Sequence, residues 1–539
     1  MNHILFVLKV PQDRDSGFIA LGEMALALDG ELSHYLTTIC THLREAIAPC
    51  RNNPSLEALA CVGNIAKVMG STTEPHIRSL LDVMFSSGLS TVLVETLEQI
   101  SMSIPSLMPT IQDRLLDSIS MVLSKSPYLG RPAQSIGKGT IINIGQQVSE
   151  LSGSALIQLS LQTLARFNFK GHDLLEFARE SVVVYLDDED RSTRKDAALC
   201  CCKLISTSFS GIVSAHFGSK RLSRSGGKRR RLVEELVEKL LISAVADADV
   251  TVCHSILTSV HGDRGFDEYL AQADNLSAVF AALNDEDFDV REYTTSVAGR
   301  LSEKNPAYVL PALRRYLIQL LTYLGKSADS KCKEESAKLI VCLIRNCERL
   351  ILPYISLIHK ALVARLLDVN ANIGIISGVL VTVWDLSRVG GFAMRQYIPE
   401  LMPLIVEALL DGAAVSKREI AVATLGQVVQ STGYVITPYN EYPQLLGLLL
   451  KLLNGPHGEV TRPASDSSQE IQSIDESPMD LWPSFASSDD HYSTVAIDSL
   501  MQILRDPSLA NYHLKVVGSL MFIFKAVGLG CVPYLPKIV

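Results

Sequence analysis

An apolar residue followed by proline recurs through the second half of this 539-residue chain at nearly constant spacing. The step stands at Pro311, Pro353, Pro399 and Pro438, at intervals of 42, 46 and 39 residues. Because proline fits the first turn of a helix but not its interior, each step predicts the start of a helix. A regular period of this length predicts that the chain repeats one structural unit.

A second marker is an arginine that follows a helix-capping residue by two positions. It occurs at Arg194, Arg291 and Arg418, behind the turns LDDEDRSTR, LNDEDFDVR and LLDGAAVSKR. The arginines lie 97 and 127 residues apart, which corresponds to two and three units of the same length. They could line a binding surface, but the acidic turns beside them favour a role in holding the array together.

The stretch 416–455 shows what one unit contains. Ser416 and Glu419 have the spacing of a capping box, which predicts the start of a helix. Gly433 predicts the end of that helix, and a leucine-rich second helix follows up to Gly455. Neither helix can bury its apolar face alone, so the unit requires neighbours on both sides.

A two-helix period of about 40–47 residues is typical of HEAT and armadillo repeats, whereas tetratricopeptide units have 34 residues. Hydrophobic residues make up 47% of the chain and aromatic residues only 6%, which fits aliphatic helix packing. We therefore predict an all-α fold, a superhelical HEAT/armadillo-type solenoid of antiparallel helix pairs.

Composition divides the chain into three parts. Residues 1–455 are predicted to form the repeat array, with a basic loop inserted at 219–231. Residues 456–492 are rich in Ser, Asp and Pro and are predicted to be disordered. Residues 493–539 return to helical periodicity, and we expect the last helix pair to be incomplete.

Charge and cysteine usage limit the classes of partner and compartment. A net charge of −9 does not favour binding to nucleic acid. Apolar runs are interrupted before the ~18 residues needed to cross a bilayer, so we expect no transmembrane segment. The eleven cysteines form no C-x-x-C pair, which indicates a reducing compartment. We expect the cytoplasm, with the nucleus or the periphery of endomembranes as further locations.

Motifs for catalysis are missing from the sequence. The GKG at 137–139 lacks the rest of a phosphate loop, and HGDR at 261–264 does not have the order of a kinase catalytic loop. The histidines and cysteines show no metal-ligand spacing. We therefore predict no catalytic, cofactor-binding or metal-binding residues and no small-molecule substrate.

The basic segment is the one candidate site. As a solvated loop it needs no function, but a Lys/Arg run of this kind also fits a nuclear localisation signal or a phosphate-binding patch. Two serines among the arginines, Ser223 and Ser225, are candidate phosphorylation sites, and their modification would cancel local positive charge. The basic residues are Lys220, Arg221, Arg224, Lys228, Arg229, Arg230 and Arg231.

Long stretches of the chain resemble the target-of-rapamycin protein kinases. The clearest are residues 265–321, 417–455 and 514–539, and RDSGFIALGEMALALDGEL at 14–32 resembles the plant branch of the family. The resemblance extends over almost the whole chain and rests on long runs instead of a short motif.

The resemblance implies a serine/threonine kinase with a long N-terminal HEAT solenoid, followed by a FAT region, a rapamycin-binding region and a kinase domain. This chain resembles only a middle part of the solenoid, so no catalytic residue can be transferred to it. The implied role is a scaffold for raptor-like and rictor-like subunits and for a second copy of the kinase, in the two complexes that control growth in response to nutrients. The alternative is an independent HEAT-repeat transport or adaptor protein of the importin type.

One junction departs from the family pattern. We expect a further helix after the leucine-rich helix that ends near Gly455, but Pro456 begins the polar segment directly. A splice variant or a deletion in the gene sequence would explain this, and our hypothesis is that a helical segment is missing between these two residues.

Overall fold

The computed structural model describes most of the chain, and regular structure in the described part is entirely helical. This confirms the predicted all-α class. Contacts divide the chain into two units, Met1–Val297 and Ala298–Val539. The described residues are 2–10, 12–27, 31–48, 54–126, 128, 153–216, 223–369, 371–411, 414–433, 437–453, 497, 500–501, 504 and 510–527.

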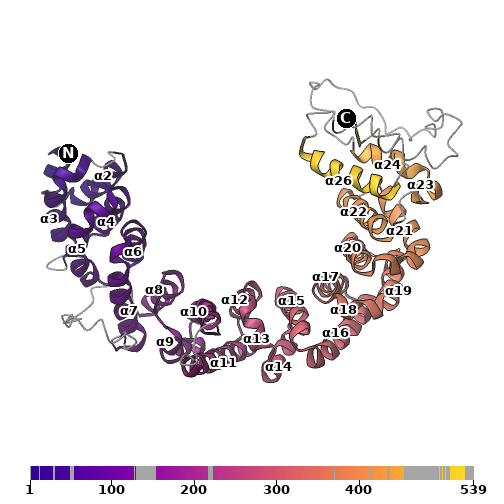
Figure 1. Ribbon diagram of the computed structural model, residues 1–539, viewed down its shortest axis with the longest axis horizontal. Helices are drawn as coiled ribbons and strands as arrows, with labels where there is room; N and C mark the ends of the chain where they lie inside the picture. The colour runs from indigo at the N-terminus through magenta and orange to yellow at the C-terminus, as the bar shows by residue number, and fades with distance from the viewer. Residues whose placement is uncertain are drawn as a thin grey trace. The chain divides into compact units, whose positions relative to one another are not determined.

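The first unit is a stack of antiparallel helix pairs in two layers (Figure 1). In its first half, α4 packs between α2 and α6 in one layer, while α5 packs between α3 and α7 in the other. Further along, α10 packs between α8 and α12, and α11 packs on α14. The helices are α1 (Asn2–Val7), α2 (Arg14–Ala27), α3 (Leu36–Ile47), α4 (Leu56–Met69), α5 (Glu74–Ser86), α6 (Thr91–Ser103), α7 (Met108–Ser124), α8 (Gly153–Arg166), α9 (Leu175–Phe177), α10 (Arg191–His216), α11 (Ser223–Ala246), α12 (Val250–Gly262), α13 (Asp267–Leu270), α14 (Ala273–Ala282) and α15 (Phe288–Lys304), the last of which crosses into the second unit.

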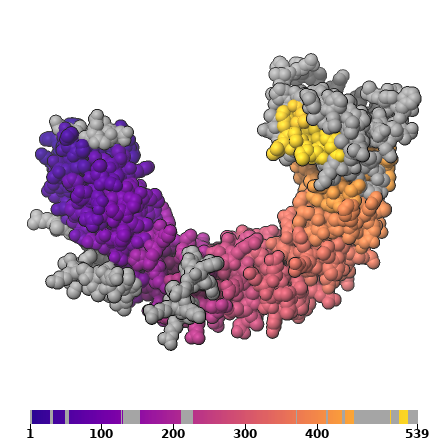
Figure 2. Space-filling view, viewed as in Figure 1, coloured from indigo at the N-terminus to yellow at the C-terminus, as the bar shows by residue number. Residues whose placement is uncertain are grey.

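The second unit repeats the same plan. Helix α20 packs between α17 and α22, and α19 packs between α16 and α21 in the other layer. The surface over these pairs is continuous on the face seen in Figure 2, so side chains close the space between successive pairs. The helices are α16 (Pro306–Lys326), α17 (Ser330–Asn346), α18 (Glu348–Ile351), α19 (Ile355–Leu366), α20 (Ile373–Gly390), α21 (Ile398–Leu410), α22 (Val415–Thr432), α23 (Thr437–Glu441), α24 (Gln444–Leu453) and α26 (Ala510–Val527).

Three of the four marker prolines stand at helix starts, as predicted. Pro353 lies in the 3-10 turn just before α19, Pro399 is the second residue of α21, and Pro438 is the second residue of α23. Pro311 is the exception, because α16 begins five residues earlier at Pro306 and runs through it. A proline there removes one helical hydrogen bond.

The predicted helix caps are the residues two positions before each marker arginine, Ser192, Asp289 and Ser416, and each lies two residues beyond the cap in the structure. Helices α10 and α15 begin before Ser192 and Asp289, and their caps are Asp190 and Asp287, whose carboxylates accept the amides of Thr193 at 2.8 Å and Val290 at 3.2 Å. In α22 the cap position is Ala414, without a side-chain hydrogen bond, so Ser416 and Glu419 form no capping box. Gly433 does end α22 in the left-handed conformation, with φ of 69°.

The caps themselves form a series that the apolar pattern does not reveal. Each is an Asp or Asn whose side chain accepts an amide hydrogen in the first turn of the helix that follows, at 2.7–3.2 Å. Ala414 continues the series at the same spacing but has no acceptor. The capped starts are Asp190 in α10, Asp249 in α12, Asp287 in α15, Asp329 in α17 and Asn372 in α20.

One stretch of the described chain, Ile373–Leu410, is long and apolar enough to cross a membrane by length and composition. It consists of two helices, α20 and α21, joined by the 3-10 segment Gly391–Tyr397. Of its most apolar window, 44% is buried inside the protein. The two helices pack against α17, α19 and α22 of the array.

The C-terminal part is described only in pieces. Of the α24 leucines, Leu445 and Leu446 are buried. Near the end of the chain, Ile497 and Met501 pack against Val516 and Leu520 of α26 in a small apolar cluster. The whole segment predicted to be disordered, 456–492, and the residues beyond Val527 lie outside the described residues.

Candidate functional site

The marker arginine Arg194 binds two successive turns of the array. Its Nη1 donates to the carbonyl oxygens of Asp188 and Glu189, at 3.0 and 3.1 Å, in the turn before its own helix. Its Nε and Nη2 donate to the two carboxylate oxygens of Asp247, at 2.7 and 3.0 Å, in the turn before α12. Arg194 therefore joins neighbouring repeats, and its guanidinium is occupied by the fold.

The second marker arginine makes the same contacts with the turn before its own helix. Arg291 Nη1 donates to the carbonyls of Asp285 and Glu286, at 2.7 and 3.0 Å. Arg418 lies at the same place relative to its helix start, since its amide bonds to the carbonyl of Ala414. The Nε of Arg418 is buried and has no hydrogen-bond partner among the residues described. The geometry at Arg194 and Arg291 agrees with the structural interpretation of these arginines.

The basic segment differs from the loop that the sequence predicts. Residues 223–231 form the first turns of α11, because this polar stretch continues directly into the amphipathic run LVEELVEKLL. Lys220 and Arg221 lie outside the described residues, and the side chains of Ser223, Arg224 and Ser225 are likewise not described. Their proposed localisation and regulatory roles stay predictions.

Three of the basic side chains on α11 pair with acids on other turns. Lys228 Nζ lies 3.1 Å from Glu176, and Arg229 Nη2 lies 2.8 Å from Asp173. Arg230 pairs with Glu234 at 3.1 Å and with Glu268 at 3.4 Å. Arg231 is exposed. Part of the basic segment therefore attaches α11 to the preceding repeat.

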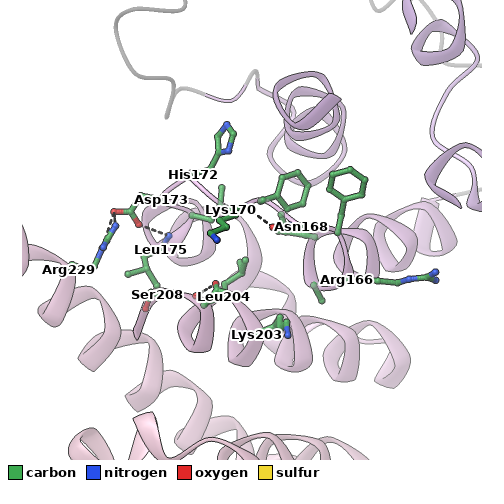
Figure 3. Close-up of a pocket in the computed structure, with 17 residues that line it drawn as sticks. Arg166, Asn168, Lys170, His172, Asp173, Leu175, Lys203, Leu204, Ser208 and Arg229 are labelled. Carbon is green, nitrogen blue, oxygen red and sulfur yellow. Dashed lines mark hydrogen bonds and ion pairs between the residues drawn. The ribbon is translucent and has the colours of Figure 1, made fainter. Parts of the chain in front are cut away.

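A cavity of about 600 Å³ opens beside this attachment, between the end of α8, the loop 167–174 and helix α10 (Figure 3). Its basic side chains are Arg166, Lys170, His172, Lys203 and Arg229, and its single acid is Asp173. No sequence motif predicts this cavity, because its residues come from several elements that are far apart in the sequence, among them α8, α10 and α11.

The loop 167–174 that forms one wall is fastened to α7. Gln112 Nε2 donates to the carbonyl of Asn168 at 2.6 Å, and Gln112 is itself buried. His172 Nε2 lies 3.1 Å from Asp113 Oδ1. These contacts fix the loop, so the wall of the cavity is formed before any ligand arrives.

Metal ligands and reactive thiols are the two kinds of site that the described residues allow us to test. No group of three or more His, Cys, Asp or Glu side chains there is placed to hold a metal ion. Burial raises the pKa of the Cys202 thiol to about 12 and that of Cys253 to about 12. Thiols with such pKa values remain protonated at neutral pH and are poor nucleophiles.

Comparison with known proteins identifies relatives over the whole chain. The serine/threonine-protein kinase TOR of Arabidopsis thaliana is 67% identical over 100% of this chain, and that of Oryza sativa subsp. japonica is 62% identical. The chain belongs to the target-of-rapamycin family. The relation extends beyond plants, since the Drosophila melanogaster kinase mTor is 32% identical over the full chain. A family model described as the serine/threonine-protein kinase mTOR domain matches residues 456–539.

This member of the target-of-rapamycin family spans only 23% of the length of the Arabidopsis and rice relatives. The Arabidopsis alignment is 576 residues long against 539 in this chain, so about 37 aligned positions have no counterpart here. That number is close to one repeat. The family model match begins at Pro456, the residue at which the sequence departs from the family pattern.

Solved structures with a similar fold are karyopherins. The crystal structure of Kap121p has a TM-score of 0.53 at 13% identity, covering 99% of this chain and 47% of that chain. The Kap95:Nup1 complex has a TM-score of 0.52 at 10% identity, covering 98% of this chain and 62% of that chain. At such identities the likeness shows the fold alone, and it confirms the helical-repeat solenoid.

Proposed function

We propose that this chain is a non-catalytic scaffold region of a target-of-rapamycin serine/threonine kinase. The observation that carries the proposal is the 67% identity to the Arabidopsis kinase along the entire chain, combined with coverage of only 23% of that relative. The described residues form helix pairs whose polar contacts, such as Arg194 with Asp247, serve the array itself. A kinase assay on the purified chain with a generic serine/threonine substrate should show no activity above a blank, and activity above the blank would contradict the proposal.

The proposed partners are raptor-like and rictor-like subunits, together with a second copy of the kinase, in complexes that control growth in response to nutrients. A stacked helical array offers an extended surface to other proteins. Among the proteins with the same fold, Kap121p has been crystallised bound to Nup53p and to Pho4p. The test is a pull-down of a plant raptor-like subunit by the purified, folded chain, with the serum-albumin-coated resin as a blank.

An importin-type adaptor is the second candidate, and the karyopherin-like fold is the observation that favours it. The pull-down separates the two candidates. Capture of the raptor-like subunit supports the scaffold, whereas a chain that is folded by circular dichroism and captures none of it supports the adaptor. We place the scaffold in the cytoplasm, with the nucleus and the periphery of endomembranes as further locations, and imaging of a fluorescent fusion tests this.

A further inference from the structure

The cavity beside α10 is lined by positive charges, and some of them form no ion pair with a described residue. Arg229 is paired with Asp173 at 2.8 Å, and Arg166 is paired with Glu98 at 2.9 Å. Lys170 and Lys203 are exposed, and neither has an acidic partner among the described residues. Because Asp173 already binds Arg229, no acid in the lining is left to neutralise these two lysines.

The two lysines stand on opposite walls. Lys170 comes from the loop 167–174, and Lys203 comes from the middle of α10 (Figure 3). The lining also contains apolar side chains that are almost fully buried, among them Phe167 and Leu204. The cavity therefore combines an apolar floor with two cationic edges. Its volume of about 600 Å³ is within the ~300–1,000 Å³ that ligand pockets usually have.

A second hollow of about 370 Å³ continues from the first, and the two share Ala165, Arg166 and Lys203. It runs along α10 past Ser206 toward Phe266. The pair of hollows forms a groove that follows α10, with Lys203 between its two halves. A groove of this kind accommodates an extended segment better than a compact small molecule.

We propose that this groove binds an acidic peptide segment of a partner protein. Carboxylates of the segment would pair with Lys170 and Lys203, and an aliphatic side chain between them would lie on the floor formed by Phe167 and Leu204. The proposal rests on the proposed scaffold function and specifies the chemistry of one partner contact. Fastening of the loop to Gln112 and Asp113 favours binding, because little ordering remains to be done when the peptide arrives.

The test is fluorescence polarisation with the full chain and a labelled probe peptide that has four glutamates on each side of a central leucine. The control probe has glutamine in place of every glutamate. We expect the acidic probe to bind and the glutamine probe not to bind. The Lys170→Glu/Lys203→Glu variant should weaken the affinity by about tenfold or more, because it places like charges against the probe.

The matched control variant is Lys67→Glu, since Lys67 is an exposed lysine on α4 far from the cavity in sequence. It should change the affinity by less than about twofold, because isolated exposed charges contribute little. Thermal melting of both variants should match that of the unaltered chain.

Three outcomes would overturn the proposal, in addition to a failure of the acidic probe to bind. They are equal binding of the two probes, undiminished binding by the Lys170→Glu/Lys203→Glu variant, and equally tight, equally lysine-dependent binding of a labelled oligothymidylate. The last would indicate a general polyanion site. If the raptor-like subunit is captured by the chain while the acidic probe is not bound, the groove proposal fails and the scaffold function stands.

Discussion

Arg194 and Asp247 are 53 residues apart in the sequence and are joined side by side through two hydrogen bonds of 2.7 and 3.0 Å. The pair is largely shielded, since the Arg194 side chain is 17% exposed and that of Asp247 is 4% exposed. The same guanidinium also closes the turn before its own helix. One side chain therefore fixes both the local turn and the step to the next repeat.

Replacing Arg194 with alanine should destabilise the first unit by roughly 2–3 kcal/mol, because it leaves the buried Asp247 carboxylate without its charged donor. The matched control is Arg191→Ala in the same turn. Arg191 pairs with Asp249 at 3.4 Å but is 71% exposed, so its loss should have an effect below about 0.5 kcal/mol.

Thermal melting of both variants, with hydrogen exchange of the turn amides before α12, measures the difference. Equal melting temperatures for Arg194→Ala and Arg191→Ala would show that the Arg194–Asp247 pair does not stabilise the repeat junction.

The acid sensitivity of the first unit should come from the carboxylates of these turns. Burial opposes ionisation of Asp247, but hydrogen bonds from Arg194 and from the Asp249 amide outweigh it, and the pKa of Asp247 is lowered. Hydrogen bonds from Thr193 lower the pKa of Asp190, and those from Thr251 lower the pKa of Asp249. In the unfolded chain these groups titrate near ~3.9. Their stabilisation is therefore complete above that value and is lost as the pH falls below it.

An Asp190→Asn/Asp249→Asn variant tests this, because asparagine retains a capping oxygen and does not titrate. Melting temperatures measured between pH 3 and pH 7 should fall less steeply at the acid end for the variant than for the unaltered chain. If the melting temperatures of the variant and of the unaltered chain fall equally steeply at low pH, the acid sensitivity comes from other groups.

The cap series predicts a stabilising substitution at Ala414. This residue occupies the cap position of α22 in an extended conformation, with φ of −133° and ψ of 102°, and has no side-chain acceptor. Ala414→Asp should stabilise the second unit by about 0.5–1 kcal/mol, since it supplies the missing acceptor. Ala414→Glu adds the same charge on a longer side chain and should give less than half that gain. A melting temperature raised equally by both variants would indicate a charge effect.

The basic segment yields a cellular prediction. Alanine at Lys228, Arg229, Arg230 and Arg231 should lower the nuclear fraction of a fluorescent fusion if the segment is a localisation signal. Lys228 and Arg229 also pair with acids of the preceding repeat, so Glu176→Gln/Asp173→Asn is the control that breaks these two ion pairs and keeps the basic charge. An unchanged nuclear fraction in the alanine variant, or an equal loss in the control, would end the localisation hypothesis.

The missing segment is open to direct test. Sequencing the transcript and the gene across Gly455 and Pro456 should reveal a segment in the gene that the transcript lacks. We expect about 37 codons, the number of extra positions in the whole Arabidopsis alignment. An uninterrupted exon across this junction would refute our splicing hypothesis.

The sequence was sufficient for the fold class and for three of the four helix starts marked by proline, because proline and the apolar period act locally. Pro353, Pro399 and Pro438 stand where the pattern places them, and Gly433 ends α22 as predicted. It was insufficient for the helix caps, since Ser192 and Ser416 also have capping chemistry and only the tertiary packing selects Asp190 and Ala414.

The candidate site was less predictable than the fold. The basic segment suggested a loop because glycine and serine interrupt it, but the helix that follows extends back to Ser223 and uses Arg229 to hold Asp173. The groove depends on Lys170 and Lys203 meeting across a gap, which no local pattern records. Residues that are adjacent only after folding have no signature along the chain.

The cap series has a consequence for how such a protein changes over generations. Because five successive repeats from α10 to α20 each carry their own start signal in an Asp or Asn, loss or gain of one such repeat leaves the next helix able to begin where it did before. A difference of about 37 positions between this chain and its Arabidopsis relative is close to one such module. The number of repeats in the array can therefore change by one whole repeat at a time, without any change in the sequence of the neighbouring repeats.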